Sequence, residues 1–322
     1  MRWTFVIALL ALALATPAGA LADGGPVPPE QGGSGIAVPG SPYRYVALAA
    51  AHHATLVRRL GASGASLRVR GAYGVPGVDY GGSTTGLSAN GRTLVLAELA
   101  GSARPRTTRL LVLDTPRLAV RARIALPGWS VLDAISPDGR WLYLIHYAAS
   151  DVSKYEVLAY DLATRHTLAK PIVDPHDGDE PMTGFPVTRV MGNGDRWAYT
   201  LYVRASGAPF IHALDTAGVR AVCVDLPSAL ANMDVGNAHL ALGAGGATIR
   251  VGIDGVTQAV VNTRTFTVRS APFASALVST VQPVARGGGG GGGGIPWWAV
   301  AGAAALALLG GAARLRARPG TG

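Results

Sequence analysis

Two short patterns recur in register along the middle of this chain, and the repeat they form constrains the fold more than any other feature. A turn of the form Ser-x-Asn/Asp-Gly-Arg is complete at residues 88–92 and 136–140, and each copy leads into alternating apolar residues. Weaker copies stand at residues 193–199 and 236–242. Since one such turn could arise by chance, a second signal in the same register is needed to establish a repeat.

That second signal follows each turn at a nearly constant distance. An apolar residue precedes an aspartate in three units and an asparagine in the fourth, and a proline then closes each unit. The pairs are Leu113-Asp114, Tyr160-Asp161, Leu214-Asp215 and Val261-Asn262, and the prolines are Pro127, Pro175, Pro227 and Pro272. Two signals in register over four units indicate a repeat architecture.

Each unit has the pattern of four antiparallel strands. Asn-Gly and Asp-Gly between alternating apolar runs are hairpin signals, because these residues tolerate the positive φ that tight turns require. We therefore interpret Asn90 and Asp138 as structural turn residues and not as ligands. A degenerate first unit over residues 45–76 brings the total to about five units of roughly 42 to 55 residues.

The turn Ser136-Pro137-Asp138-Gly139-Arg140, followed by an alternating strand, resembles the repeat of bacterial extracytoplasmic β-propellers, which include TolB-like, YVTN-type and WD-like repeats. The resemblance covers residues 84–273 and, more weakly, 42–76. It implies an all-β fold, a β-propeller of about five to six four-stranded blades around a central channel. Residues 274–285 are a candidate closing strand. A β-sandwich with long loops is the alternative fold.

The N-terminus carries an export pattern. Arg2, an apolar run at 5–15 and small residues at 18–22 are typical of a signal peptide, so we predict that residues 1–22 are cleaved off. An uncleaved anchor is the alternative. A Gly/Pro-rich segment at 23–41 then precedes a β-propeller ectodomain at 42–286.

The C-terminus carries a membrane pattern. An unbroken glycine run at 287–294 is typical of a flexible linker. Residues 295–313 hold no charge and would span about 28 Å as a helix, close to the hydrocarbon core of a bilayer. Two tryptophans stand at its outer end, where indoles prefer the membrane interface. The arginines in a basic cytoplasmic tail at 314–322 satisfy the positive-inside rule. We expect a single-pass transmembrane helix at 295–313; a buried Ala-rich helix and a proteolytically clipped sorting tail are the alternatives.

Charge and cysteine content narrow the function classes. The net charge is +9, but the basic residues are scattered and lack the aromatic companions that single-stranded nucleic acid requires, so we predict no nucleic-acid binding. Cys223 is the only cysteine, which excludes an intrachain disulfide and a multi-cysteine metal site. Its valine neighbours indicate a core position in a strand.

The candidate site is an acidic loop. In propellers of this kind the loops between successive blades lie on one face and the Asp-Gly hairpins on the other, and we place 75–85 and 174–183 among the inter-blade loops. The second loop concentrates oxygen ligands of the kind that Ca²⁺ prefers, although its spacing is not that of an EF-hand. A solvated acidic loop is the alternative. The predicted metal-binding residues are Asp174, His176, Asp177, Asp179 and Glu180.

The remaining histidines suggest no site: we interpret His52 and His53 as surface loop residues, and His146, His212 and His239 as strand residues that pack or hydrogen-bond. The chain has no nucleophile elbow, zinc-protease motif or phosphate-binding loop.

The leading hypothesis is therefore a membrane-anchored extracytoplasmic binding or interaction module, with an unknown extracytoplasmic protein or glycan as partner. The alternatives are a propeller-type hydrolase or lactonase-like enzyme with a metal near the central channel, and a receptor that signals through a separate partner.

Overall fold

The computed structural model describes residues 26–271, except 39, 62–63, 102–103, 150, 152–153, 177–181, 205 and 233–234. The expected signal peptide, glycine linker, membrane helix, basic tail and closing strand at 274–285 lie outside the described residues. Within them, no helix has the length and apolar character needed to cross a membrane.

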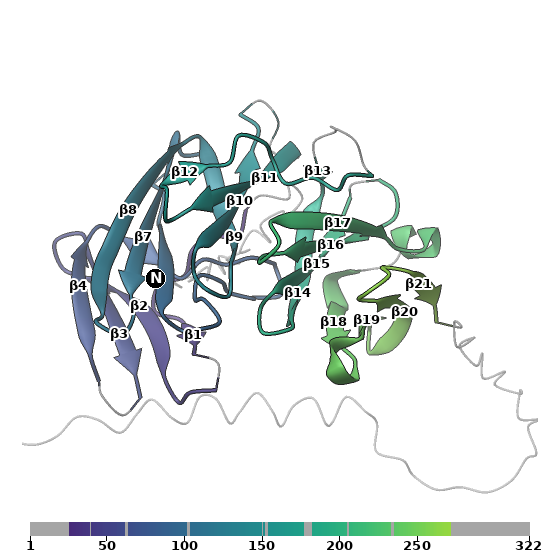
Figure 1. Ribbon diagram of the computed structural model, residues 1–322, viewed down its shortest axis with the longest axis horizontal. Helices are drawn as coiled ribbons and strands as arrows, with labels where there is room; N and C mark the ends of the chain where they lie inside the picture. Colours follow the sequence, from purple (N-terminus) through teal and green to yellow (C-terminus); the bar gives the residue numbers. More distant parts are fainter. Residues whose placement is uncertain are drawn as a thin grey trace, which may run out of the picture. The chain divides into compact units, whose positions relative to one another are not determined.

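Antiparallel sheets follow one another along the chain, each with its main strands paired in sequence order (Figure 1). The first sheet contains β1 (Ile36–Ala37), β2 (Arg44–Ala50), β3 (Ala54–Leu60) and β4 (Ser66–Arg70). The second contains β5 (Tyr73–Gly74), β6 (Thr93–Glu98), β7 (Thr107–Asp114) and β8 (Ala119–Pro127). The third contains β9 (Trp129–Ile135), β10 (Trp141–Tyr147), β11 (Lys154–Asp161) and β12 (His166–Thr167), with β13 (Met182–Thr183) also paired to β11.

The fourth and fifth sheets repeat this arrangement, and short 3-10 helices lie around the fifth. The fourth sheet contains β14 (Phe185–Gly192), β15 (Trp197–Val203), β16 (Phe210–Asp215) and β17 (Arg220–Asp225). The fifth contains β18 (Ala238–Leu242), β19 (Thr248–Ile253), β20 (Val256–Asn262) and β21 (Val268–Ser270). The 3-10 helices are η2 (Ser228–Asn232), η3 (Val235–Asn237) and η4 (Ala244–Gly246).

The repeated turn joins the first two strands of a sheet, as predicted. Between β9 and β10, the Ser136 hydroxyl donates to Asp138 Oδ1 (2.5 Å) and accepts from the backbone N–H of Trp141 (2.9 Å). Gly139 closes the turn with a φ of 75°, a conformation that favours glycine. The same bonds occur between Ser88 and the residues after it in the second sheet. Asp138 is therefore a structural turn residue.

The second repeated pattern closes the turn between the third and fourth strands. Asp161 Oδ1 accepts a bond from the backbone N–H of Ala163 (2.8 Å), and the Arg140 guanidinium binds both oxygens of the Asp161 carboxylate (3.1 and 2.8 Å). Arg196 and Asp215 repeat this paired contact in the fourth sheet. In the third and fourth sheets the two sequence patterns therefore mark the two partners of one ion pair, whereas in the second sheet Asp114 pairs with Arg117 of its own turn.

Acid should weaken this ion pair. The hydrogen bond from Arg140 is the main cause that lowers the pKa of Asp161 from 3.8 to about 2. Since the pKa is lower in the folded chain, the stabilisation is complete above about pH 4 and is lost as the pH falls through about 2. We expect the thermal midpoint to fall over this window, and to fall less steeply in Arg140→Gln. Circular dichroism melts at stepped pH measure this; identical slopes in wild type and Arg140→Gln would contradict the assignment.

Neighbouring sheets pack face to face through shared hydrophobic clusters. One cluster joins the first and second sheets, another the second and third, two join the third and fourth, and the largest joins the fourth and fifth. None of these clusters of described residues contains members of both the first and fifth sheets. Successive four-stranded antiparallel sheets with shared faces are the blades of a β-propeller. The prediction of an all-β fold with four-stranded blades is confirmed.

A buried ion pair adds a polar link between the third and fourth blades. Arg189 on β14 donates hydrogen bonds to the backbone carbonyl and side chain of Asp133 on β9, and its Nε donates to Thr200 Oγ1 (2.8 Å). The side chains of Arg189 and Asp133 are 4% and 1% exposed. Burial without such a partner would leave either charge poorly solvated.

Residues 75–85 do not connect two blades as predicted, but form an insertion within the second blade. Gly74 pairs with Ala97, and further along the chain Leu87 pairs with Leu94, so both flanks of the insertion lie against β6. The sequence prediction was wrong because β5 is only two residues long and its strand resumes after the insertion.

The insertion reaches the fourth blade. The backbone N–H groups of Tyr80 and Gly81 donate to the carbonyls of Pro186 (3.2 Å) and Val187 (3.0 Å), at the start of β14. The N-terminal segment joins the same region, because Glu30 and Val75 exchange backbone hydrogen bonds of 2.8 and 2.9 Å. Part of the Gly/Pro-rich segment expected at 23–41 thus contributes to the fold, through this bridge and through β1.

Candidate functional site

A pocket of about 620 Å³ lies between the second and third blades. It is lined by the end of β6, the start of β7, the start of β9, the base of the insertion and the N-terminal segment. Because β9 begins at the pocket and ends at the Asp-Gly turn, the pocket and the repeated turns lie at opposite ends of the strands. The pocket is therefore on the side where one blade connects to the next, as expected for a propeller site.

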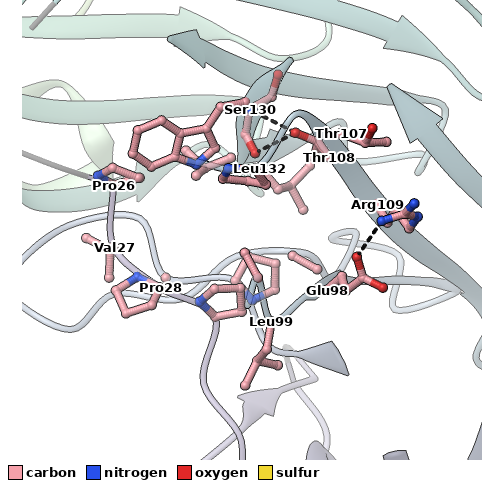
Figure 2. A pocket seen from close by; sticks show the side chains of 18 of the residues that line it. Pro26, Val27, Pro28, Glu98, Leu99, Thr107, Thr108, Arg109, Ser130 and Leu132 are labelled. Atoms are coloured by element: carbon pink, nitrogen blue, oxygen red, sulfur yellow. Dashed lines mark hydrogen bonds and ion pairs between the residues drawn. The ribbon is translucent and has the colours of Figure 1, made fainter. Parts of the chain in front are cut away.

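Most of the pocket wall is apolar. Pro26, Val27 and Pro28 close one side, and Leu132 and Leu99 lie on opposite sides of the space, with the Leu99 side chain directed away from it (Figure 2). The prolines restrict the backbone of the N-terminal segment, so this wall is preorganised.

A glycine allows this wall to form. A Cβ atom at Gly77 would stand 2.4 Å from Val27 Cγ1, closer than two carbon atoms can approach. A side chain at Gly77 would force Val27 to shift from its place against the base of the insertion. The wall formed by Pro26 and Val27 therefore depends on Gly77, in the insertion of the second blade.

One ion pair stands on the opposite side of the pocket. Arg109 on β7 donates from Nη1 to Glu98 Oε2 on β6 at 3.1 Å (Figure 2). The two side chains are 52% and 30% exposed. Such exposed pairs contribute little to stability, so either charge can exchange its partner for a charged group of a ligand.

Hydroxyl groups fix the chain where it passes from the second blade to the third. The Thr108 hydroxyl donates to the carbonyl of Gly128 (3.0 Å) and accepts from the backbone N–H of Ser130 (2.7 Å). The Ser130 hydroxyl lies 2.9 Å from Nδ1 of His146, its cross-strand partner on β10. The interpretation of His146 as a hydrogen-bonding strand residue is confirmed.

A row of four aromatic rings in contact begins at Trp129 in the pocket wall and continues into the protein core. The ring of Trp129, which lines the pocket, is 5.1 Å from that of Tyr147; Tyr147 is 5.9 Å from Tyr155, and Tyr155 is 5.7 Å from Tyr202. Burial raises the pKa of the tyrosines Tyr147, Tyr155 and Tyr202, so their hydroxyls remain neutral at physiological pH. The series holds the Trp129 ring in place and supplies no proton donor or acceptor that titrates near neutrality.

The predicted calcium ligands are described only in part. Asp177, Asp179 and Glu180 lie outside the described residues. Asp174 is 4% exposed, and it accepts hydrogen bonds from the backbone N–H groups of His176 (2.9 Å) and of Cys223 on β17 (2.7 Å). Asp174 therefore fastens the loop to the fourth blade.

The electrostatics of Asp174 agree with this anchoring role. Burial favours a higher pKa, but the hydrogen bonds from His176 and Cys223 outweigh it and hold the pKa of Asp174 below its ordinary value. Among the described residues, no group of three His, Cys, Asp or Glu side chains could hold a metal ion. Calcium binding by the whole loop stays a prediction.

The other residues singled out by the sequence have structural positions. His52 and His53 form the turn between β2 and β3, both with positive φ (59° and 48°). His212 and His239 lie in β16 and β18, and Cys223 lies half-buried in β17. None of them lines the pocket.

Comparison with known proteins assigns the chain to no family. No protein-family model and no curated protein matches it. Among solved structures it is similar to a hydrazine synthase of Kuenenia stuttgartiensis, with 16% identity, a TM-score of 0.43 and coverage of 70% of this chain and 63% of that chain. It is also similar to TolB from Acinetobacter baumannii, with 14% identity, a TM-score of 0.38 and coverage of 70% and 51%.

A third similar structure is a protein of unknown function from Desulfotomaculum acetoxidans, with 12% identity, a TM-score of 0.44 and coverage of 73% of this chain and 67% of that chain. The chain thus spans between half and two thirds of the length of these proteins. At such identities the similarity concerns the fold alone.

Proposed function

We propose that this chain is a membrane-anchored extracytoplasmic β-propeller that acts as a binding module, and that its ligand enters the pocket between the second and third blades. The observation that carries the proposal is the pocket itself. Its volume of about 620 Å³ falls in the range of ligand sites, and its wall combines an apolar surface with a few polar groups. The membrane anchor rests on the sequence pattern at residues 295–313 alone.

The geometry favours a ligand with an apolar body and a charged end. The apolar body would lie between the prolines of the N-terminal segment and the indole of Trp129, and the charged end would reach Glu98 or Arg109. The ring of Trp129 is held by its neighbours and the opposite wall by its prolines, so little ordering would accompany binding. A short peptide end or a small amphipathic molecule has this chemistry.

Filling the pocket should abolish binding. Ala97 lines the pocket and its side chain points towards the third blade, so Ala97→Trp would occupy the space. We expect wild-type protein to bind anilinonaphthalene sulfonate, which has an apolar body and an anionic group, and to enhance its fluorescence. Ala97→Trp should lose this enhancement while thermal melts show that it is folded, and Thr167→Trp on β12 of the third blade should keep the enhancement. Equal enhancement in all three proteins would place the binding surface elsewhere.

One observation favours the alternative of a hydrolase. The Ser130 hydroxyl and the His146 imidazole are within hydrogen-bond distance, and Ser130 lines the pocket, which is the arrangement of a nucleophile and its base. In the part of the chain that the structure describes, no carboxylate is bonded to His146. Ester turnover by wild type that disappears in Ser130→Ala would favour the enzyme; absence of turnover together with ligand binding would favour the binding module.

A further inference from the structure

Among the described residues, the first blade packs one face on the second blade, and no hydrophobic cluster joins its other face to a blade. Tyr45, Val57 and Val69 point into the cluster shared with the second blade. Residues at alternate positions on the same strands therefore point the other way. Five of these define what we call the Leu–Arg face: Leu48, Leu56, Arg58, Arg68 and Arg70.

The strand register brings these five side chains together. Leu48 on β2 pairs with Leu56 on β3, which pairs with Arg68 on β4. Arg58 is two residues from Leu56 along β3, and Arg70 is two residues from Arg68 along β4. The Leu–Arg face thus has leucines on its inner strands and arginines towards its outer edge.

The leucines are half-buried and the arginines are exposed. None of the five residues belongs to a hydrophobic cluster. Among the described residues, no carboxylate forms an ion pair with Arg58, Arg68 or Arg70, whereas seven other arginines do form such pairs. Those paired arginines are Arg109, Arg117, Arg140, Arg189, Arg196, Arg204 and Arg220. An apolar centre with an arginine rim is the composition of protein interfaces.

The fifth blade does not complement this face. On its side away from the fourth blade, Arg250 on β19 and Arg269 on β21 flank Val260, and both arginines are exposed. Packing this side on the Leu–Arg face, within one chain or between two copies, would oppose arginine to arginine. Like charges opposed at an interface are unfavourable, so the outer side of the fifth blade, in the same chain or in a second copy, is not a suitable occupant, and neither is a second Leu–Arg face.

The geometry points to an acidic segment of another protein as the occupant of the Leu–Arg face. Carboxylates of that segment would bind the guanidinium groups of Arg58, Arg68 and Arg70, which match carboxylates with two parallel hydrogen bonds. Its apolar side chains would cover Leu48 and Leu56. This surface lies on the first blade, whereas the pocket lies between the second and third, so the two inferences stand independently.

The test uses the full chain in detergent micelles and a fluorescein-labelled acidic peptide of glutamate and leucine, with binding followed by fluorescence anisotropy. The face variant carries Arg58→Ala, Arg68→Ala and Arg70→Ala. The control carries Arg92→Ala, Arg165→Ala and Arg264→Ala, which removes the same charge from exposed turn residues on other blades. Thermal melts confirm that both variants are folded.

We expect the face variant to bind the peptide about tenfold more weakly than wild type, and the control to stay within about twofold. Raising the salt concentration should reduce the difference, since the arginines are exposed. An equal loss in both variants would overturn the proposal, because general charge attraction would then explain binding. It would also be overturned if phosphatidylglycerol vesicles bound the face at low salt while the peptide did not, which would identify a lipid surface.

Discussion

Replacing Arg189 by methionine should lower the free energy of unfolding by about 3–5 kcal/mol. Among the described residues, Arg189 is the only side chain that binds the Asp133 carboxylate through Oδ1, and the other oxygen, Oδ2, is buried without a partner. Asp133 would then be a buried charge with no counter-charge. Urea unfolding followed by tryptophan fluorescence measures the change.

A double variant separates the lost partner from the lost packing. Asp133→Leu combined with Arg189→Met replaces both charges by apolar groups, and such replacements of buried pairs are often neutral. We therefore expect the double variant to recover most of the stability lost in Arg189→Met. If the double variant were as unstable as Arg189→Met, the lost packing of the Arg189 side chain, and not the unpaired charge of Asp133, would explain the loss of stability.

Gly139→Val should destabilise the protein through two separate costs. Valine at a φ of 75° is strained by about 1–3 kcal/mol. In addition, a Cβ at this position would stand 2.5 Å from Thr93 Oγ1 and 2.8 Å from its Cβ, on the second blade. Overpacking of this kind costs about a further 1–3 kcal/mol. Thermal and urea melts report the total.

Gly194 supplies the matched control. It has a similar φ of 62°, but a Cβ there meets no atom within 4 Å. Gly194→Val should therefore show the strain alone, and the difference between the two variants measures the contact between the second and third blades. Equal losses at both positions would mean that the turn at Gly139 does not pack on Thr93.

The sequence predicts the repeated turns because their interactions are local. The side chains of Ser136 and Asp138 bond to residues within five positions along the chain, so the residue pattern contains the information needed to recognise the turn. His146 and Cys223 are likewise assigned to strands from the sequence, because the alternation of apolar and polar residues in a strand is visible in the residues next to them along the chain. The number and order of strands in each blade follow from these local signals.

The pocket could not be predicted in this way. Its walls come from the N-terminal segment, the second blade and the start of the third, which meet only after the blades have packed. No spacing in the sequence relates Val27 to Gly77 or Arg109 to Trp129. The acidic loop shows the same limit: the pattern draws attention to Asp174 as a ligand, but it does not show that the Asp174 carboxylate also accepts a hydrogen bond from the backbone N–H of Cys223 on the next blade.

The insertion that reaches from the second blade to β14 has a consequence for how the molecule loses its structure. Repeat proteins whose units touch only their neighbours can open one unit at a time, starting from an end. Here the hydrogen bonds from Tyr80 and Gly81 link units that are not adjacent in sequence, with the third blade between them. Opening the third blade therefore strains these two hydrogen bonds, although they join the second blade to the fourth and not the third blade to either neighbour. The second, third and fourth blades should accordingly exchange their amide hydrogens as one cooperative unit, with the first and fifth opening more freely.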